Sequence, residues 1–401
     1  MQMNIEWKIL MNSFKVPRIR FKEFDVIWVE KRIADIVKIS AGGDVDKIKL
    51  KESGKYPVIA NALTNKGIVG FYDDYKVKAP AVTVTGRGDV GYAVARHENF
   101  TPIVRLLTLQ SENIDVDYLE NQINSMRILN ESTGVPQLTA PQLGNYKVYH
   151  PEIEEQSAIG SLFRLLDDLL ASYKDNLANY QSLKATMLSK MFPKAGQTVP
   201  EIRLDGFEGE WKIIRLGKVI LEAYQGINTA SDKVEYSVSG IPILQAKHIT
   251  NGQINYKDAR YLDMDIYEHY ISKYMPKKGE ILFANIGTIG PSVLVDTDEM
   301  FLIAWNILKM SIKDNYSPVF IKITLSLLDS KHIFGRITTG NATKFINKDE
   351  IMDIRIRVPS LLEQQAIGAY FSNLDQLITS YQEKITQLET LKKKLLQDMF
   401  I

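Results

Sequence analysis

One stretch of about 40 residues occurs twice in this chain and constrains the fold more than any other feature. The first copy begins at Pro151 and ends at Met191-Phe192, and the second begins at Pro359 and ends at Met399-Phe400. The copies align without a gap at an offset of about 208 positions, with roughly 17 of 42 positions identical, which marks an internal repeat. Matched apolar positions recur at steps of three and four, which predicts a helix with a narrow apolar seam, as in a coiled coil.

Each helix needs a long partner to cover this seam. A helix of about 40 residues measures about 60 Å, more than the width of a small domain, and the chain supplies a second one. Ser360 and Glu363 predict a capping box at the start of the second helix. The seam residues that we expect to pack the helices or contact a partner are Ile159, Phe163, Leu166, Leu170 and Tyr173 in the first copy and Ile367, Phe371, Leu374, Ile378 and Tyr381 in the second.

The repeated unit is larger than the helix. An opening motif places Pro, Arg and Trp at the same spacing in both halves, as Pro17, Arg20 and Trp28 and as Pro200, Arg203 and Trp211. Short β-rich runs bounded by turn residues, followed by a helical stretch and a Thr-Gly loop (Thr133-Gly134, Thr339-Gly340), predict a mixed α+β domain in each half. The predicted order is an N-terminal extension (1–14), a first globular domain (15–150), a long helix (151–192), a Pro/Gly linker (193–199), a second domain (200–358) and a second long helix (359–401).

Composition limits the classes of protein to consider. The chain has 401 residues and no cysteine, which excludes disulfides and thiolate metal sites and suits the cytoplasm. The sequence contains neither an apolar run of membrane-spanning length nor an N-terminal pattern typical of a signal peptide. The formal net charge is only +1. A free-standing DNA-binding protein usually has a basic excess, so DNA binding would require local basic residues or a partner that supplies phosphate contacts.

No motif in the sequence predicts catalysis, a cofactor or a metal. The pattern Gly86-x-Gly88-x-x-Gly91 matches a dinucleotide fingerprint, but the next residues predict a strand where that fold requires a helix. A glycine-rich turn between two strands is the favoured interpretation, and Asn285–Gly290 is its equivalent in the second half. The five histidines show no metal-ligand spacing.

Polar loops rich in hydrogen-bond donors occur in both halves. Arg and Lys can read guanine, and Asn can read adenine, so such loops are candidates for base recognition. For any single residue, a plain solvated loop is the more common explanation. Loops around Asn61–Lys66, Lys247–Asn251 and Thr338–Lys344 have this composition. The predicted DNA-binding residues are Asn65, Lys66, Arg87, Lys247, His248, Asn285, Thr288 and Lys344.

The duplicated opening motif and the paired sequences Glu155-Gln156-Ser157-Ala158-Ile159 and Glu363-Gln364-Gln365-Ala366-Ile367 resemble those of the specificity subunits of type I restriction–modification systems. The resemblance covers nearly the whole chain after residue 15. It implies two target-recognition domains separated by two long antiparallel helices in a coiled coil, with a pseudo-two-fold axis. It also implies that each domain reads one half of a bipartite DNA target, and that helix length sets the gap between the halves.

The resemblance further implies a role without catalysis. In that family the partners are double-stranded DNA, two methyltransferase subunits and, for cleavage, translocase–nuclease subunits. The base-reading residues of the family vary, so none is transferred to this chain. Three other functions remain open: a stand-alone sequence-specific DNA-binding protein, a coiled-coil adaptor, and a fused restriction–methylation enzyme, which the absence of catalytic motifs disfavours.

Overall fold

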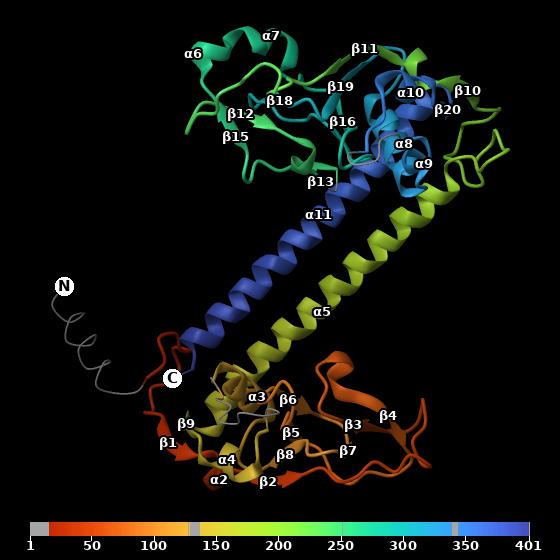
Figure 1. The fold of residues 1–401 in the computed structure, drawn as a ribbon. Coiled ribbons are helices and arrows are strands. Elements are labelled where there is room, and N and C mark those ends of the chain that lie inside the picture. Colours follow the sequence, from red (N-terminus) through yellow and green to blue (C-terminus); the bar gives the residue numbers. More distant parts are fainter. Residues whose placement is uncertain (1–15, 127, 129–136, 251, 339–343, 401) are drawn as a thin grey trace. The chain divides into compact units, whose positions relative to one another are not determined.

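The computed structural model describes residues 16–126, 128, 137–250, 252–338 and 344–400. They form two compact units: unit 1 holds the described residues of Met1–Leu177 and Ser380–Ile401, and unit 2 holds those of Ala178–Thr379. Two helices of 38 residues, α5 (Ile153–Lys190) and α11 (Leu361–Asp398), contribute to both units (Figure 1). The two predicted long helices are therefore confirmed. The predicted extension at 1–14 and the loops Thr133-Gly134 and Thr339-Gly340 lie outside the described residues.

Unit 1 contains three small sheets. A four-stranded antiparallel sheet has the order β2-β8-β5-β6, a three-stranded sheet has the order β4-β3-β7, and β1 pairs with β9. All four residues of β5 are buried, and Val82, Val84 and Leu109 form a core with α3. The elements are β1 (Val29–Arg32), α2 (Ile33–Ile36), β2 (Lys38–Ala41), β3 (Tyr56–Ile59), η1 (Thr64–Gly67), β4 (Ile68–Tyr72), β5 (Ala81–Val84), β6 (Ala93–Arg96), β7 (Thr101–Pro102), β8 (Leu107–Gln110), α3 (Val116–Ser125), α4 (Ala140–Asn145) and β9 (Lys147–His150).

Unit 2 repeats this topology. Its sheets have the orders β11-β19-β16-β17, β15-β12-β18 and β10-β20, with a small additional β13-β14 pair. The elements are β10 (Lys212–Arg215), η2 (Leu216–Lys218), β11 (Ile220–Gln225), β12 (Ile241–Leu244), η3 (Ala246–His248), β13 (Ile249–Thr250), β14 (Gln253–Ile254), β15 (Arg260–Leu262), α6 (Met264–Tyr267), η4 (Glu268–Tyr270), α7 (Ile271–Tyr274), β16 (Ile281–Ala284), β17 (Ser292–Leu294), β18 (Leu302–Ile303), β19 (Ile307–Ile312), α8 (Pro318–Ser330), α9 (Ile333–Ile337), α10 (Lys348–Asp353) and β20 (Arg355–Val358).

The two units share even the mixed pairing of their three-stranded sheets. In unit 1, β3 pairs antiparallel with β4 and parallel with β7. In unit 2, β12 pairs antiparallel with β15 and parallel with β18. One clear difference is the α6–α7 segment of unit 2, because no helix lies between β4 and β5 in unit 1. The α+β class and the internal repeat predicted from the sequence are thus present in the fold.

The long helices pack antiparallel within each unit. In unit 1, the Lys392 ammonium lies 2.5 Å from Asp167, and the Lys174 ammonium lies 2.7 Å from Glu389, so the α11 numbers fall as the α5 numbers rise. In unit 2, Lys184 pairs with Asp375. The two Lys–Asp pairs occupy matching positions of the repeat. The apolar side chains that surround these contacts are Ile159, Phe163, Leu166, Leu170, Ile385 and Leu388 in unit 1, and Ile367, Phe371, Leu374, Tyr180 and Met187 in unit 2.

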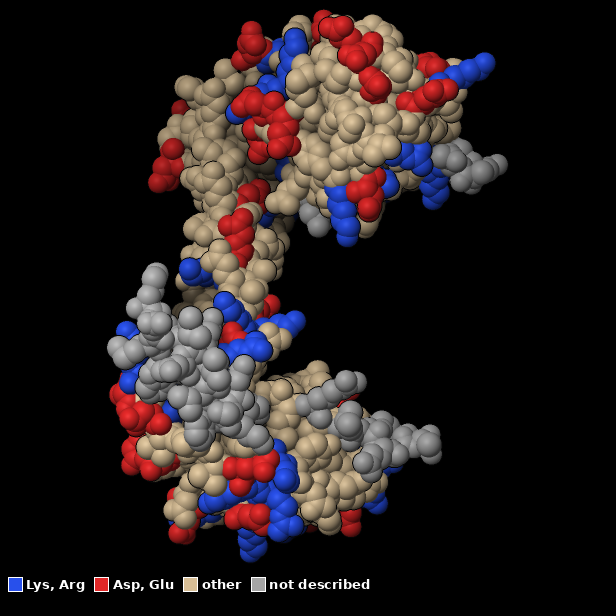
Figure 2. Space-filling model, turned by 90° about the vertical axis from the view of Figure 1, so that its left-hand side faces the viewer, with Lys and Arg blue, Asp and Glu red and all other residues tan. Residues whose placement is uncertain are grey.

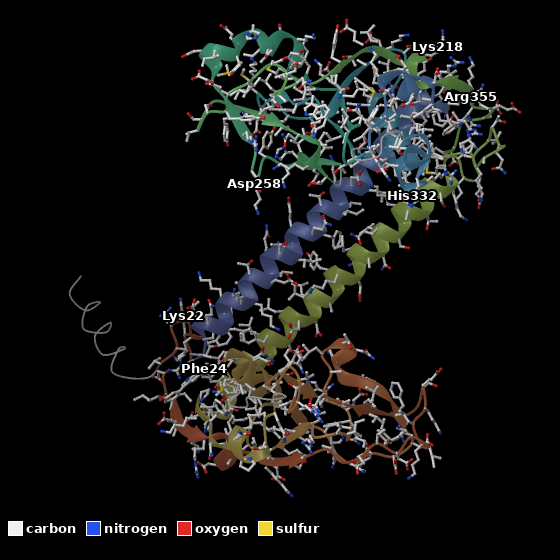
Figure 3. All side chains as sticks on the ribbon, viewed as in Figure 1. Lys22, Phe24, Lys218, Asp258, His332 and Arg355 are labelled. Atoms are coloured by element: carbon white, nitrogen blue, oxygen red, sulfur yellow. The ribbon has the colours of Figure 1, made fainter. Side chains whose placement is uncertain are left out.

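The end of each long helix packs against the start of the other. In unit 1, the Phe400 ring lies 5.5 Å from Tyr118 and 5.8 Å from Phe163 between ring centroids. In unit 2, the Phe192 ring lies 5.5 Å from Phe320 and 6.3 Å from Phe371. Figure 3 shows Lys22 and Phe24 of the opening segment close to the C-terminal end of α11.

A buried ion pair joins the opening motif to the helix start in both units. Arg20 forms two hydrogen bonds with Glu155, of 2.6 and 2.7 Å, and Arg203 contacts Glu363 at 2.8 and 2.7 Å. Both carboxylates are 1% exposed. Two bonds in a fixed fork orient the guanidinium as well as neutralise it. The duplicated Arg and Glu motifs are therefore two ends of one contact.

The sequence-predicted capping box is only half present. The Ser360 hydroxyl accepts a hydrogen bond of 3.3 Å from the Glu363 amide, but the Glu363 carboxylate is committed to Arg203. The adjacent glutamine ties each helix to the domain helix beside it. The Gln156 side chain accepts from the Asp115 amide, and the Gln364 side chain accepts from the Ser317 amide. Asp115 and Ser317 are the N-caps of α3 and α8, so these two helices are equivalent in the repeat.

Candidate nucleic-acid interface

Arg87 lies at the tip of the glycine-rich turn between β5 and β6. These strands pair antiparallel, and Gly88 and Gly91 have positive φ angles of 77° and 88°. Only glycine adopts such angles readily, which explains the glycine spacing without a nucleotide. The strand–turn–strand interpretation is confirmed, and the Arg87 side chain is exposed.

Asn65 and Lys66 lie on an exposed turn with strained backbone, since both have φ near 49°. A buried arginine supports this turn. Arg96 of β6 donates 2.7 Å to the Lys66 carbonyl and 2.9 Å to the Thr83 hydroxyl. Burial lowers the pKa of Arg96 to about 10, so the residue stays protonated at neutral pH and can keep holding the turn. Nothing in the sequence indicates this role, because the supporting contact joins residues 30 positions apart.

Asn61 joins the two loops of unit 1. Its side chain accepts a hydrogen bond of 2.7 Å from the Gly86 amide and donates to the Val104 carbonyl. The structure therefore brings the predicted residues Asn65, Lys66 and Arg87 onto loops that are tied together.

Two residues that sequence reasoning missed belong to the same group of loops. Arg105 is exposed and donates 3.0 Å to the Gln137 side chain, and Gln137 forms a β-bridge with Arg87. Arg105 also has a positive φ of 61°. It follows a two-residue strand and carries no motif, so nothing in the sequence distinguished it from other surface arginines.

In unit 2, Thr288 and Lys344 come together in an equivalent arrangement. The Gly287 amide donates 2.9 Å to the Lys344 carbonyl, and Ile286 forms a β-bridge with Phe345. Both Thr288 and Lys344 are exposed. Lys247 is also exposed, on the separate loop that follows β12. Asn251 and residues 339–343 of the predicted polar loops lie outside the described part of the chain.

His248 and Asn285 are buried, at 3% and 2% exposure. The Asn285 amide exchanges hydrogen bonds of 2.9 and 3.2 Å with Gln225 and donates to the Ile346 carbonyl. The His248 ring accepts from the Gln245 amide at 2.8 Å. Burial, with a smaller contribution from Lys247, lowers the pKa of His248, so the ring is neutral at pH 7 and can accept this bond. In this structure both side chains hold loops together.

Charge on the surface is mixed. Figure 2 shows acidic side chains interspersed with lysine and arginine on both units, in keeping with the formal net charge of +1. No group of three or more His, Cys, Asp or Glu residues in the described ranges could hold a metal ion. None of the described helices combines the length and apolar character needed to cross a membrane.

Comparison with known proteins identifies similar sequences and folds. A family model described as the type I restriction modification DNA specificity domain matches residues 26–179 and again 208–390. The type I restriction enzyme MjaVIII specificity subunit of Methanocaldococcus jannaschii is 22% identical, over 97% of this chain and 96% of that protein.

Two solved structures share the fold. The crystal structure of the S subunit of a type I restriction–modification system from M. genitalium aligns with a TM-score of 0.68 and 16% identity, over 96% of this chain and 99% of that one. A chain from a study of complex assembly and conformational transition in the type I R-M system aligns with a TM-score of 0.50 and 15% identity, over 92% and 96%. At these identities the likeness concerns the fold alone.

Proposed function

The chain belongs to the type I restriction modification DNA specificity family, since both halves match the family model, and on that premise we propose that it selects the DNA target of a modification complex. In this proposal unit 1 reads one half of a bipartite site and unit 2 reads the other. The chain carries out no chemistry itself and needs no cofactor. It docks two methyltransferase subunits, and translocase–nuclease subunits join where cleavage occurs. We propose a cytoplasmic location for it.

The main support for the proposal is that the two units share their strand order and ion pairs but differ in their loops. Both units have the same strand order, the same buried Arg–Glu pair and the same Lys–Asp pair between the long helices. The loops at equivalent positions differ in nearly every side chain. A frame that fixes two unlike loop sets suits an asymmetric two-part target, because sequence is read by side chains at base edges.

Exposed loop residues are the base-contact candidates in this proposal. We assign this role to Asn65, Lys66 and Arg87, with Arg105 and Gln137, in unit 1. Lys247, Thr288 and Lys344 are the candidates in unit 2. We assign His248 and Asn285 to loop support, since contact with a base would require the bonds to Gln245 and Gln225 to break.

Partners account for the low net charge. Phosphate contacts supply much of the affinity of a DNA-binding protein, and this chain offers few surplus cations. Methyltransferase subunits that close around the DNA would add the missing contacts. We therefore expect weak DNA binding by the chain alone and a sharp gain in specificity when a methyltransferase subunit is added.

The test is methylation mapping of host DNA with and without the gene. A bipartite methylated motif should disappear on deletion and return on complementation. If deletion of the gene removes no methylated motif, the proposal is contradicted. Tight, specific binding by the purified chain alone would favour a stand-alone DNA-binding protein, and no footprint even with a methyltransferase present would favour an adaptor.

Exchanging the first recognition domain provides a sharper test. Residues 15–150 would be replaced by the equivalent domain of a relative with a known target. Because the frame contacts recur in both units, the exchanged domain should fold in place, and only one half-site of the methylated motif should change. A change in both half-sites would contradict the modular assignment.

Helix length should set the gap between half-sites. A helix of 38 residues measures about 57 Å, on the order of one and a half turns of B-DNA. Because Lys184 pairs with Asp375 and Lys392 with Asp167, an insertion in one helix alone would shift these contacts. Matched seven-residue insertions after Leu177 and Thr379 should lengthen the gap and leave both half-sites unchanged. The insertion in α5 alone serves as the control and should mainly lower stability.

A further inference from the structure

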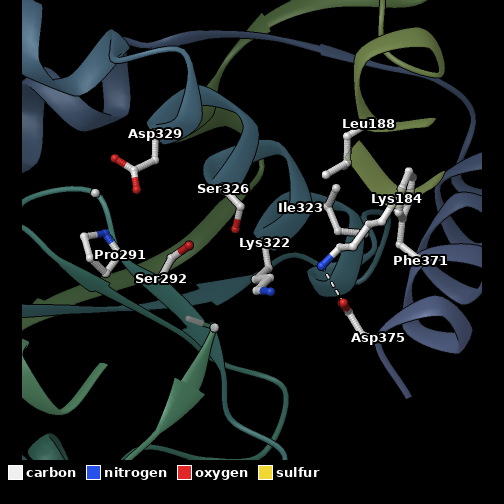
Figure 4. A pocket seen from close by; sticks show the side chains of 12 residues that line it. Lys184, Leu188, Pro291, Ser292, Lys322, Ile323, Ser326, Asp329, Phe371 and Asp375 are labelled. Atoms are coloured by element: carbon white, nitrogen blue, oxygen red, sulfur yellow. Dashed lines mark hydrogen bonds and ion pairs between the residues drawn. The ribbon is translucent and has the colours of Figure 1, made fainter. Parts of the chain in front are cut away.

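A cavity of about 320 Å³ lies within unit 2, where α8 meets the two long helices. Its lining includes Lys184, Lys322, Asp375, Ser292, Ser326 and Asp329. Figure 4 shows the Lys322 side chain pointing into the cavity, with the Lys184–Asp375 pair on one side and Asp329 toward the opposite end. Polar and apolar side chains both line the cavity, and its volume suffices for a small charged group.

Lys322 carries a partly buried charge. Among the described residues it makes no hydrogen bond or ion pair, and Asp375 is the nearby carboxylate that favours its charged form. Burial lowers the pKa of Lys322, Asp375 offsets part of this effect, and the nearby Lys184 lowers the pKa by a smaller amount. Asp375 is paired with Lys184 and is therefore shared between two ammonium groups. A partly buried cation that is incompletely compensated costs stability and is a frequent mark of a ligand site.

The rim of the cavity comes from the two polar loops of unit 2. Gly252 ends the turn that follows Lys247 and His248, and Gly290-Pro291 ends the turn that carries Thr288. The Lys322 ammonium lies directly against the first of these, because a β-carbon added at Gly252 would come within 2.9 Å of it. A ligand in the cavity would therefore touch the loops assigned to DNA.

The equivalent place in unit 1 has the opposite charge. Two residues after the equivalent aromatic rings Tyr118 and Phe320, α3 has Glu120 where α8 has Lys322. Glu120 faces the matching Asp167 and Lys392 as Lys322 faces Asp375 and Lys184. The Glu120 carboxylate would repel an anion at this position, whereas the Lys322 ammonium would attract one.

We propose that this cavity holds a backbone phosphate of the DNA half-site read by unit 2, with Lys322 as its contact. The inference rests on the proposed function and adds a positioning residue to it. One phosphate fixed beside the two loops would set their register on the duplex without reading sequence. Unit 1 has Glu120 in the equivalent place and therefore lacks this particular contact.

The experiment measures affinity of the chain with its methyltransferase partner for a duplex bearing the mapped motif, across a series of salt concentrations. Lys322→Met removes the charge and keeps most of the side-chain volume. We expect affinity to fall about five- to ten-fold and the slope of log K against log salt to fall by about one, as for the loss of one phosphate contact. Lys331→Ala, an exposed lysine just after the same helix, and Glu120→Gln at the equivalent site should leave the slope unchanged.

A scan with single neutral methylphosphonate linkages locates the phosphate. One linkage in the half-site of unit 2 should weaken wild-type binding and cost the Lys322→Met variant nothing further. If the wild type binds the motif but Lys322→Met binds equally well, the phosphate contact is wrong and the proposed function stands. If the wild type does not bind the motif, the proposed function itself fails. If inorganic phosphate shifts the Lys322 resonance while the salt slope is unchanged by the variant, the cavity binds free anions and the DNA assignment is wrong.

Discussion

Units 1 and 2 share three contacts at the long helices, yet they differ in the charges around those contacts. Both have the Arg–Glu pair, the glutamine that accepts from the N-cap amide of the neighbouring domain helix, and the Lys–Asp pair. Around this frame, unit 1 adds Glu120 where unit 2 adds Lys322. The comparison indicates that the shared contacts change little because their residues depend on one another. A charged residue outside these contacts can be replaced by one of the opposite charge.

The buried Arg–Glu pairs should show the largest effect. In unit 1, Glu155 also accepts a hydrogen bond of 3.1 Å from the Trp28 indole, whereas the Trp211 indole nitrogen of unit 2 has no partner among the described residues. Removing one partner of a buried pair costs about 3–5 kcal/mol because the other charge stays buried. We expect Glu363→Gln to cost about 3 kcal/mol and Glu155→Gln about 1 kcal/mol more, because glutamine offers one acceptor oxygen where Glu155 uses two to accept from Arg20 and the Trp28 indole.

Urea denaturation, with hydrogen exchange resolved by peptide, would assign each loss to its unit. Glu154→Gln changes an exposed neighbour of the same type and should alter stability little. Equal losses for Glu155→Gln and Glu363→Gln would show that the Trp28 hydrogen bond contributes nothing, and the two frames would then be energetically the same.

Glu120 should make the stability of unit 1 depend on pH. Burial, and then the nearby Asp167, raise the pKa of Glu120 to about 7, against the partial compensation of Lys392 and the Ala95 amide. Tyr92, Arg96 and Asp117 also face it. A carboxyl whose folded pKa lies above its unfolded value binds more protons when folded, so unit 1 should lose stability as pH rises from about 4.5 to about 7.

Glu120→Gln should remove this loss and stabilise unit 1 by about 2 kcal/mol at pH 8, with little change at pH 5. This gain in stability is measured by unfolding of the full chain at pH 5 and pH 8, followed by hydrogen exchange of each unit. Unit 2 is the internal control, because Lys322 stands in the equivalent place. If the stability of unit 1 depends on pH as strongly in the Glu120→Gln variant as in the wild type, Glu120 is ionised at both pH 5 and pH 8 and Lys392 neutralises it.

The features of the fold that could be predicted from the sequence are those that depend on the spacing of residues along the chain. The apolar repeat from Ile159 to Tyr173 predicted a helix that needs a partner, and the glycines at 86, 88 and 91 predicted a turn between strands. The pairing of Arg20 with Glu155 was not predictable, because the two residues are 135 positions apart and nothing in either motif names its partner. His248 and Asn285 belong to residue types common in exposed loops, and only the structure shows Gln245 and Gln225 beside them.

The reversed charge at Glu120 and Lys322 escaped detection for another reason. It lies in the diverged part of the repeat, where the two halves share their order of elements but not their sequence. The equivalence becomes visible only through the residues around it, namely the N-caps Asp115 and Ser317 and the rings of Tyr118 and Phe320. A difference in charge between the units thus lies beside residues that occupy equivalent places in both.

The smallest expected effect concerns the Lys–Asp pairs themselves. Each is partly exposed, so its coupling should be about 0.5–1 kcal/mol. In unit 1 Lys392 faces two carboxylates, Asp167 and Glu120, so Lys392→Met should cost about 0.5 kcal/mol more than Asp167→Asn. In unit 2 the order should reverse, because Asp375 faces both Lys184 and Lys322, and Asp375→Asn should cost more than Lys184→Met.

Double-mutant cycles on both pairs, by urea denaturation at low and high salt, measure these differences, and both should shrink as salt rises. The reversal is the decisive result, since a general preference for keeping lysine or aspartate would give the same order in both units. If lysine and aspartate variants rank in the same order in both units, Glu120 and Lys322 do not influence the Lys–Asp pairs. The Glu120–Lys322 difference then has no effect on the packing of the long helices.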